Sequence, residues 1–230
     1  MKEISIAIDG PAGAGKSTIA RRIAQILSYT YIDTGAMYRA VTLKALRQGA
    51  DFLDEKKLET IAEQIQINLK PYTSTDGKYN NRVIMDGEDV TEEVRTPLIS
   101  QNVSLAAKVP GVRDHMVRLQ RNMADAGGVV MDGRDIGTVV LPQAELKVFL
   151  TASIEERAKR RYKELIEKGY QIDLAALQEE IALRDKIDSE REIAPLKQAA
   201  GALVINTTNL TIQQVVELII KEHEKKKGGR

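Results

Sequence analysis

Cysteine and tryptophan are absent from this sequence of 230 residues, and phenylalanine occurs only twice. Without cysteine the chain has no disulfide bonds, no zinc site built on thiolates and no cysteine nucleophile, which suits a reducing compartment. The few aromatic rings leave little for the stacking of nucleic-acid bases. With 34 Lys and Arg against 33 Asp and Glu, the formal net charge is +1, so no overall field attracts nucleic acid or an acidic membrane. We therefore expect neither nucleic acid nor a membrane among its partners.

Long apolar runs and metal-ligand spacings are missing as well. No apolar segment approaches the length that crosses a membrane, and the first residues lack the pattern of a secretory signal, so we expect a cytoplasmic protein. His115 and His223 are far apart and have no neighbour at metal-ligand spacing, which predicts surface or packing roles for both. A hydrophobic content of 43% is enough for a full core, and nothing marks a large exposed apolar patch. We expect one domain with small insertions, and a monomer by default.

The strongest motif lies near the N-terminus, where an apolar strand pattern at residues 4–8 leads into a glycine-rich loop and then into a helical pattern. This order and spacing are those of a phosphate-binding P-loop. The motif comprises Gly10, Pro11, Ala12, Gly13, Ala14, Gly15, Lys16, Ser17 and Thr18. Its backbone N–H groups and the helix N-terminus attract phosphate, Lys16 can reach the outer phosphates, and Ser17 can offer its hydroxyl to Mg²⁺. The sequence therefore predicts that the chain binds ATP or GTP, with Mg²⁺ as cofactor.

Apolar strands alternate with helices along most of the chain. We expect strands at residues 4–8, 29–32, 129–131, 146–150 and 202–205, and helices at 16–27, 34–49, 58–65, 97–108, 112–127, 153–169, 174–192 and 211–222. Five apolar strands separated by helices predict an α/β fold, with a five-stranded parallel sheet and helices on both faces. The lysines from residue 225 onward are expected to form a frayed, solvated end.

The pattern changes between residues 65 and 94. Residues 64–69 and 82–85 read as strands, and turn residues follow at 74–77 and 86–89. We therefore expect a small antiparallel sheet at about residues 65–90, inserted into the β/α chain. The expected division is a core domain of residues 1–35 and 98–230 and an insertion of residues 36–97.

Two helices carry charged sets that each share one face. The sets are Arg157, Arg160 and Arg161, and Arg184, Asp188 and Arg191. Three guanidinium groups on one face suit phosphate, although a solvated face paired with neighbouring glutamates fits the first spacing equally well. The second set, by spacing alone, is more typical of an ion-pair ladder on the surface.

A third charged group follows the expected strand at 129–131. Asp132 and Asp135 flank Arg134 just past this strand, at the edge where open α/β sheets bind ligands. One carboxylate could hold Mg²⁺ through water, and the other could receive a substrate hydroxyl or amine. A turn with capping aspartates is the alternative.

Four segments together give the sequence a specific resemblance. They are Ile8-Asp9-Gly10-Pro11 with the P-loop, Asp33-Thr34-Gly35-Ala36-Met37-Tyr38-Arg39, Asp132-Gly133-Arg134-Asp135-Ile136-Gly137-Thr138-Val139-Val140, and Arg184-Asp185 followed by Ala194-Pro195-Leu196. Over nearly its whole length the chain resembles the bacterial cytidylate kinases, nucleoside monophosphate kinases that move a phosphoryl group from ATP to CMP or dCMP. The resemblance implies a P-loop kinase fold, a helical lid at about residues 153–170 and an acceptor-binding role for the insertion.

The resemblance also implies roles for the matched positions. It places ATP on the P-loop from Gly10 to Thr18 and on the lid residues Arg157 and Arg161. It places CMP on Thr34, Tyr38, Arg39, Ser104, Arg113, Arg134, Asp135, Arg184 and Asp188. The catalytic residues are expected to be Lys16, Arg134, Arg157 and Arg191, and the Mg²⁺ ligands Ser17 and Asp132, in part through water. Ile187 stands where some relatives carry a further arginine, so the number of phosphate-binding arginines stays open.

Other functions fit the P-loop too. One alternative is a P-loop kinase for another small acceptor, such as a different nucleoside monophosphate or shikimate. Another is a nucleotide-dependent switch such as a GTPase, which the absence of an Asn-Lys-x-Asp guanine-reading motif disfavours. A nucleic-acid-dependent ATPase would need a basic stripe and stacking aromatic residues that this sequence lacks.

Overall fold

The protein is built on a five-stranded parallel sheet, as the sequence predicts. The structure is a computed structural model that describes residues 3–74, 77 and 79–228. The strands, in the order β2-β6-β1-β7-β8 across the sheet, are β2 (Thr30–Asp33), β6 (Val129–Gly133), β1 (Ile6–Asp9), β7 (Leu146–Thr151) and β8 (Leu203–Asn206). Every neighbouring pair runs parallel, so all five carboxyl ends lie at one edge of the sheet. The α/β class is confirmed.

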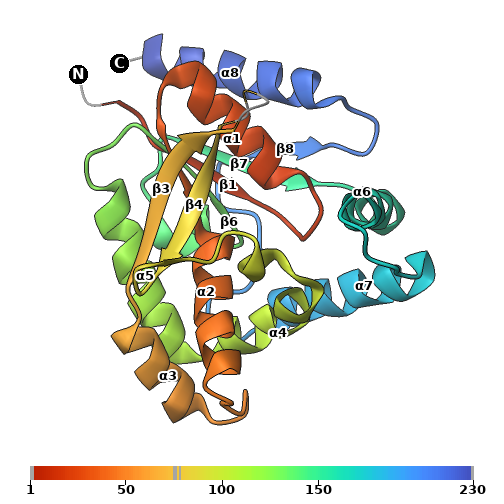
Figure 1. The fold of residues 1–230 in the computed structure, drawn as a ribbon. Coiled ribbons are helices and arrows are strands. Elements are labelled where there is room, and N and C mark those ends of the chain that lie inside the picture. Colours follow the sequence, from red (N-terminus) through yellow and green to blue (C-terminus); the bar gives the residue numbers. More distant parts are fainter. Residues whose placement is uncertain (1–2, 75–76, 78, 229–230) are drawn as a thin grey trace.

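Helices cover both faces of this sheet (Figure 1). The helices are α1 (Lys16–Leu27), α2 (Thr34–Arg47), α3 (Glu55–Gln64), α4 (Pro97–Lys108), α5 (Pro110–Ala124), α6 (Ile154–Glu167), α7 (Leu174–Glu190) and α8 (Ile212–Gly228). On one face Ile6 and Ile8 pack with Ile23 of α1 and Ile219 of α8. On the other face Ala7 joins a cluster that α5 contributes to. Successive residues of β1 thus enter opposite cores, which is why this strand is apolar at every position before Asp9.

The inserted sheet is antiparallel and has three strands. It comprises β3 (Ile67–Thr73), β4 (Tyr79–Met85) and the short β5 (Glu88–Asp89), in that order. The Asn81 side chain is buried and donates to the Tyr31 carbonyl at 2.8 Å, which fastens β4 to β2 of the main sheet. Val83 belongs to a hydrophobic cluster with α2, α3, α4 and α5, so the insertion shares its core with two helices that follow it in sequence. The division of the chain at residues 35 and 98 stays a prediction.

Several local details differ from the sequence-based expectations. The sequence favours Thr34 as the N-cap of α2, but Asp33 takes this position, because its carboxylate accepts from the Ala36 N–H at 2.9 Å. A 3₁₀ turn at Glu93–Arg95 and a π-helical turn at Ile136–Val140 were not expected. Residues 88–89 form β5 where a turn was predicted, and part of the turn predicted at 74–77 lies outside the described residues.

The frayed end predicted from residue 225 is wrong for the residues that the structure describes. Helix α8 continues to Gly228, and residues 229–230 lie outside the described part. Lys225 donates to Glu222 one turn earlier at 2.8 Å, and lysines in a last turn interact favourably with the helix dipole. His223 anchors the same helix, since its buried ring lies 3.1 Å from the Tyr29 hydroxyl. The packing role expected for this histidine is confirmed.

Candidate active site

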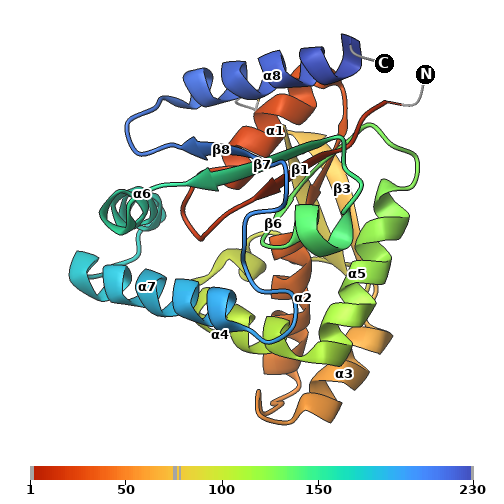
Figure 2. The same cartoon turned by 180° about the vertical axis from the view of Figure 1, so that it is seen from behind.

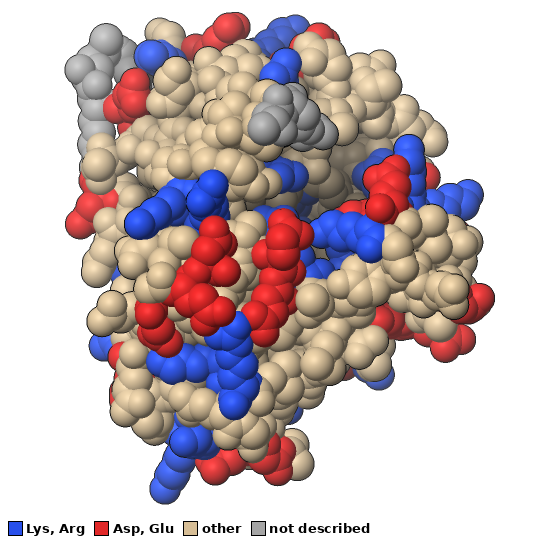
Figure 3. Space-filling view, viewed as in Figure 1, with Lys and Arg blue, Asp and Glu red and all other residues tan. Residues whose placement is uncertain are grey.

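Polar residues gather where the strands of the main sheet end. The P-loop follows β1, Thr34 follows β2 and the segment from Asp132 to Asp135 closes β6. Helices α6 and α7 lie beside this edge, away from α5 (Figures 1 and 2). In the space-filling view a hollow opens between the positions of α1 and α6, with Lys and Arg side chains at its rim (Figure 3). The sheet therefore brings segments that are over 100 residues apart to one place.

The P-loop has glycine at positions where a side chain would clash or would strain the backbone. Gly10 has φ +149°, and a Cβ there would lie 2.0 Å from the Leu150 carbonyl oxygen of β7. Gly15 has φ +88° at the start of α1, in the left-handed region that L side chains rarely adopt. A Cβ at Gly13 would lie 3.0 Å from the Arg157 Cβ of α6. The loop is thus held between β7 and α6, with its backbone free to turn toward a phosphate.

Lys16 is buried at the start of α1. Its Nζ donates to the Pro11 carbonyl at 2.8 Å, across the loop. Burial, followed by repulsion from Arg134, lowers the pKa of Lys16 well below its ordinary value, and the nearby carboxylate of Asp132 opposes this effect. An anion beside Lys16 would favour its charged form, which is the form that binds phosphate.

Asp132 accepts hydrogen bonds on both of its carboxylate oxygens. Ser17 donates to Oδ2 at 2.9 Å and the Tyr31 hydroxyl donates to Oδ1 at 2.8 Å. Burial, followed by the negative charge of Asp33, raises the pKa of Asp132 to about 6. Ser17 and Asp132 thus present two hard oxygen donors side by side, and Mg²⁺ in phosphoryl-transfer sites uses few protein ligands together with water and substrate phosphate. No group of three or more His, Asp or Glu able to hold a metal occurs among the described residues, so these two fit Mg²⁺ only in that partly hydrated form.

Asp9 has a positioning contact that the sequence did not reveal. One carboxylate oxygen accepts from the Ile136 N–H and the other from the Gly137 N–H, each at 2.8 Å. These bonds hold the π-helical turn and, with it, the adjacent Arg134 and Asp135 against the end of β1. Burial raises the pKa of Asp9 to about 6 despite both bonds. The one available signal was a carboxylate at the end of an otherwise apolar strand.

Two ion pairs organise the residues expected to bind the acceptor. Arg134 donates to Asp188 at 2.8 Å, and the Ser104 hydroxyl donates to the other oxygen of Asp188 at 3.3 Å. Burial would raise the pKa of Asp188, but Arg134 and Arg184 outweigh it and hold that pKa below its ordinary value. Asp188 is only 3% exposed and pairs with a residue of another element, so a ladder on the surface of α7 is excluded.

The second ion pair joins Arg113 and Asp135, and both side chains are buried. Burial raises the pKa of Asp135, while the charge of Arg113 opposes that rise. The guanidinium of Arg113 also lies 5.6 Å from the centre of the Tyr38 ring. Asp135 is therefore part of a buried cluster, and the alternative of a simple capping turn does not describe it.

Several arginines crowd this site without a full set of partners. Burial, and after it the charges of Arg134 and Arg39, lower the pKa of Arg184 to about 9. Burial likewise lowers the pKa of Arg39 to about 10, and that of Arg191 falls through burial and repulsion from Arg113. The Nε atoms of Arg184 and Arg191 are buried and have no hydrogen-bond partner within the described part of the chain. Such an excess of unsatisfied positive charge is the setting that an anionic ligand stabilises.

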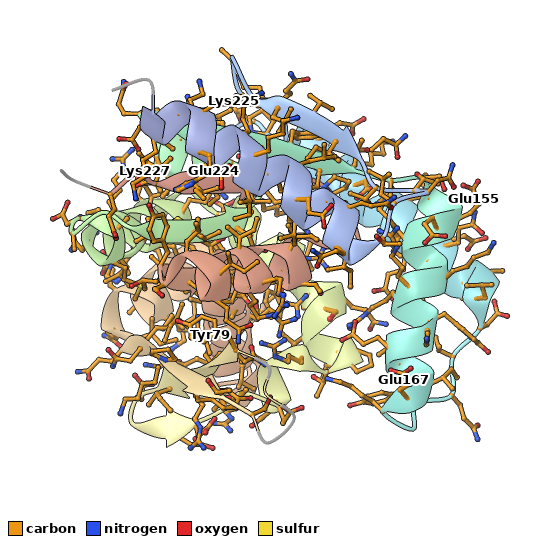
Figure 4. All side chains as sticks on the ribbon, turned by 90° about the horizontal axis from the view of Figure 1, so that it is seen from above. Tyr79, Glu155, Glu167, Glu224, Lys225 and Lys227 are labelled. Atoms are coloured by element: carbon orange, nitrogen blue, oxygen red, sulfur yellow. The ribbon has the colours of Figure 1, made fainter. Side chains whose placement is uncertain are left out.

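Helix α6 carries the three arginines that share a face. Arg157 is buried and donates to the Ala152 and Ala12 carbonyls at 3.0 Å each, and its third nitrogen lies 2.6 Å from Asp185 of α7. A solvated face is therefore excluded for Arg157. Figure 4 shows α6, with Glu155 and Glu167 labelled along it, at one side of the molecule.

The other two arginines of this face contact different segments. Arg160 pairs with Glu156 at 2.9 Å, as the alternative interpretation expected, and also donates to the Thr207 carbonyl at 2.7 Å. Arg161 lies 2.8 Å from Glu164 and 3.3 Å from the Ser100 hydroxyl of α4. Among the expected ATP ligands, Arg157 and Arg161 thus have protein partners in this structure, and their contacts with a nucleotide stay predictions.

The remaining acceptor residues are buried near the end of β6. The Thr34 hydroxyl donates to the Asp132 carbonyl at 2.7 Å, and a Cβ on Gly133 would lie 2.6 Å from that hydroxyl oxygen. Burial raises the pKa of Tyr38 to about 12. The structure therefore brings together the residues that the sequence assigned to donor and acceptor, while their individual roles rest on chemistry still to be tested.

Known proteins share both the sequence and the fold. The sequence model described as cytidylate kinase matches residues 6–225. The cytidylate kinase of Bacillus subtilis is 54% identical over 98% of each chain, and that of Anoxybacillus flavithermus is 56% identical over 95% of each chain. Among solved structures, the shikimate kinase of Bacteroides thetaiotaomicron superposes with a TM-score of 0.51 at 14% identity, covering 96% of this chain and 98% of its own. At that identity the likeness shows a shared P-loop kinase fold.

Proposed function

This chain belongs to the cytidylate kinase family, and we propose that it transfers the γ-phosphoryl group of ATP to CMP or dCMP, forming ADP and CDP or dCDP. The observation that carries the proposal is the meeting of a P-loop with a group of partly buried arginines, of which Arg184 and Arg191 have a buried Nε without a partner among the described residues. A nucleotide-hydrolysing switch would need only the P-loop. A kinase that binds two phosphate-bearing substrates needs both the P-loop and the group of arginines.

The donor half is the P-loop and the residues around it. Backbone N–H groups of the loop and Lys16 hold the β- and γ-phosphates. The negative charge of the phosphates offsets the cost of burying the Lys16 ammonium group. Ser17 and Asp132 would hold Mg²⁺, in part through water. When bound, this ion neutralises charge on the phosphates during transfer.

The acceptor half distinguishes cytosine by its hydrogen bonds. Cytosine offers an exocyclic amine, and the carboxylate of Asp135 and the hydroxyl of Ser104 are acceptors for such a group. Uracil has a carbonyl at this position, so it would bring one acceptor against another in a buried site. Rejection by a site built for hydrogen bonding reaches about 10⁴-fold in favourable cases. Arg184 and Asp188 would hold the ribose side of the same substrate.

Transfer follows from position and charge, without a covalent enzyme intermediate. Arg39, Arg134 and Thr34 hold the acceptor phosphate while one of its oxygens attacks the γ-phosphorus in line with the departing ADP oxygen. Arg191 would stabilise the transferring group, since its Nε has no partner in the described part of the chain. Arg157 must exchange one of its present partners to contact a phosphate, which would accompany movement of the lid.

A coupled assay of ADP release with ATP tests this proposal. We expect turnover with CMP and dCMP far above that with UMP, AMP or shikimate. Protein with Lys16→Met, purified in the same way, controls for contaminating kinases. Faster turnover of UMP, AMP or shikimate than of CMP and dCMP would overturn the cytidine assignment, and slow GTP hydrolysis alone would point to a switch.

Two further properties stay predictions. We propose a cytoplasmic location, supported by the family, and a monomer. In the part of the chain that the structure describes, each helix is too short or too polar to span a bilayer. Sedimentation of the purified protein would test the monomeric state.

A further inference from the structure

Gln120 of α5 is a polar residue in an unfavourable place. Its side chain is completely buried, and neither its amide nitrogen nor its amide oxygen has a hydrogen-bond partner within the described residues. Leaving a buried polar group unpaired costs about 1–3 kcal/mol, and an apolar side chain of the same shape would avoid that cost. The packing of α5 alone therefore gives no reason for a glutamine here.

Tyr38 of α2 lies between Gln120 and the acceptor cluster. The Gln120 amide is beside the Tyr38 hydroxyl, yet the contact is too poorly formed to count as a hydrogen bond. The ring of this tyrosine also lies beside Arg113, whose guanidinium is 5.6 Å from the ring centre. Gln120 and Arg113 are seven residues apart on α5, so two helical turns place both on one face.

Arg113 in turn pairs with Asp135, and both are buried. Contacts therefore run from Gln120 through Tyr38 and Arg113 to Asp135. Tyr38, Arg113 and Asp135 are all among the residues expected to bind CMP, and Asp135 is the one of the three expected to accept from its base. Hydrogen bonds in sites without substrate are often long or poorly aligned and tighten when the substrate binds.

We propose that Gln120 is a specificity-determining positioning residue, which holds Tyr38 against Arg113 and so fixes the direction in which Asp135 meets the base of the acceptor. This inference rests on the proposed function, because it assumes that Asp135 reads the base. Gln120 touches no substrate and acts through the two residues between. Its hydrogen bond to Tyr38 completes when the acceptor docks.

The variant Gln120→Met separates this role from a structural one. Methionine keeps nearly the same volume and removes both polar atoms, so the melting temperature should stay the same or rise. We expect the KM for CMP to rise about fivefold or more, with kcat and the KM for ATP within about twofold. Because a misdirected carboxylate discriminates less well, the preference for CMP over UMP should fall by about tenfold.

Two further variants make the test specific. Leu119→Met, next to Gln120 on the same helix, controls for a substitution in α5 and should leave both kinetic constants unchanged. Tyr38→Phe removes the hydroxyl and keeps the ring, so it should reproduce most of the effect of Gln120→Met. In the double variant of Gln120→Met and Tyr38→Phe, the KM for CMP should rise no more than in either single variant, because both substitutions break the same chain of contacts.

Three results would overturn the inference. A Gln120→Met protein with a lower melting temperature and unchanged kinetics, or one that fails to fold, would show that the amide is a structural group. Additive effects of the two single variants would show that Gln120 does not act through Tyr38. If the unmodified protein turned over no cytidine nucleotide, the proposed function itself would fail, which the wild-type assay reveals separately.

Discussion

Burial favours the neutral forms of both Lys16 and Asp132, and it therefore shifts their pKa values in opposite directions. The pKa of Lys16 is lowered and that of Asp132 is raised to about 6. In the proposed function each group is needed in its charged form when ATP and Mg²⁺ bind, and each ligand carries the charge that favours this form. The folded protein thus holds two residues whose charges cost stability until the donor arrives, a common arrangement in functional sites.

The variant Asp132→Asn tests this cost through its pH dependence. The ordinary pKa of 3.8 becomes about 6 in the folded protein, so between these values the folded state binds a proton that the unfolded state has released. Stability due to this proton is therefore present at low pH and is lost as the pH rises through about 6. Asparagine cannot ionise. We expect the stability of Asp132→Asn relative to the natural protein to increase from pH 4.5 to pH 7.5.

Urea unfolding of both proteins at a series of pH values, without Mg²⁺, measures this difference. The difference cancels the titration of shared groups that lie far from Asp132, while Lys16, whose pKa the Asp132 charge raises, contributes to it as a partner of the same pair. A relative stability that stays flat, or that decreases toward pH 7.5, would contradict the raised pKa of Asp132.

At the scale of elements, the P-loop is clamped between β7 and α6. Gly10 lies against the Leu150 carbonyl, so Gly10→Ala would force a Cβ to within 2.0 Å of a backbone oxygen. We expect a loss of more than about 4 kcal/mol of unfolding free energy, or no folded protein. Gly49→Ala is the matched control, because it also has a positive φ, +63°, but nothing lies within 4 Å of its Cβ.

Unfolding curves of the two alanine variants provide the comparison. The control should lose only about 1–2 kcal/mol through its left-handed backbone. Similar losses in both variants would mean that backbone conformation alone, and not the contact with β7, explains the glycine.

Helix α6 is held to the P-loop and to α7 through Arg157. Asp185→Asn removes the carboxylate that pairs with this buried guanidinium. We expect a loss of about 1–3 kcal/mol, less than for a fully buried pair because Asp185 is 20% exposed. The variant should increase the rate of amide hydrogen exchange in residues 154–167 more than it increases the rate in α1.

Glu167→Gln, which lies in α6 itself, is the control. It breaks only the exposed contact between Lys163 and Glu167, 4.0 Å long, and should change stability by less than about 0.5 kcal/mol. Equal exchange rates of α6 in Asp185→Asn and in the control would show that Asp185 does not hold the lid.

Most elements were predictable from the sequence because their apolar residues follow the period of a helix or a strand. The helix at 16–27 agrees to the residue with α1, and the inserted antiparallel sheet is confirmed. The π-helical turn at Ile136–Val140 was not predictable, because its N–H groups are held by Asp9, 127 residues earlier. Likewise α8 extends beyond its expected end, since local charges and the packing of His223 support its last turns.

At the scale of the whole molecule, a net charge of +1 conceals a strong local concentration of positive charge. The sequence identified most of the residues concerned, since they stand in recognisable motifs. It could not show that Arg134 pairs with Asp188 or Arg113 with Asp135, because these contacts depend on how α5, α7 and β6 meet. Gln120 lies in no motif, so only its burial without partners distinguishes it.

We propose that the site has a donor half at the P-loop and an acceptor half around Asp188, which share one edge of the sheet. Asp188→Ala removes the group that Arg134 and Ser104 both contact, and leaves the P-loop untouched. The measurement that tests this division most directly is the pair of KM values of this variant, for CMP at saturating ATP and for ATP at saturating CMP. We predict that the KM for CMP rises more than about tenfold while the KM for ATP changes less than about twofold. An equal rise of both values would contradict the division of the site into these two halves.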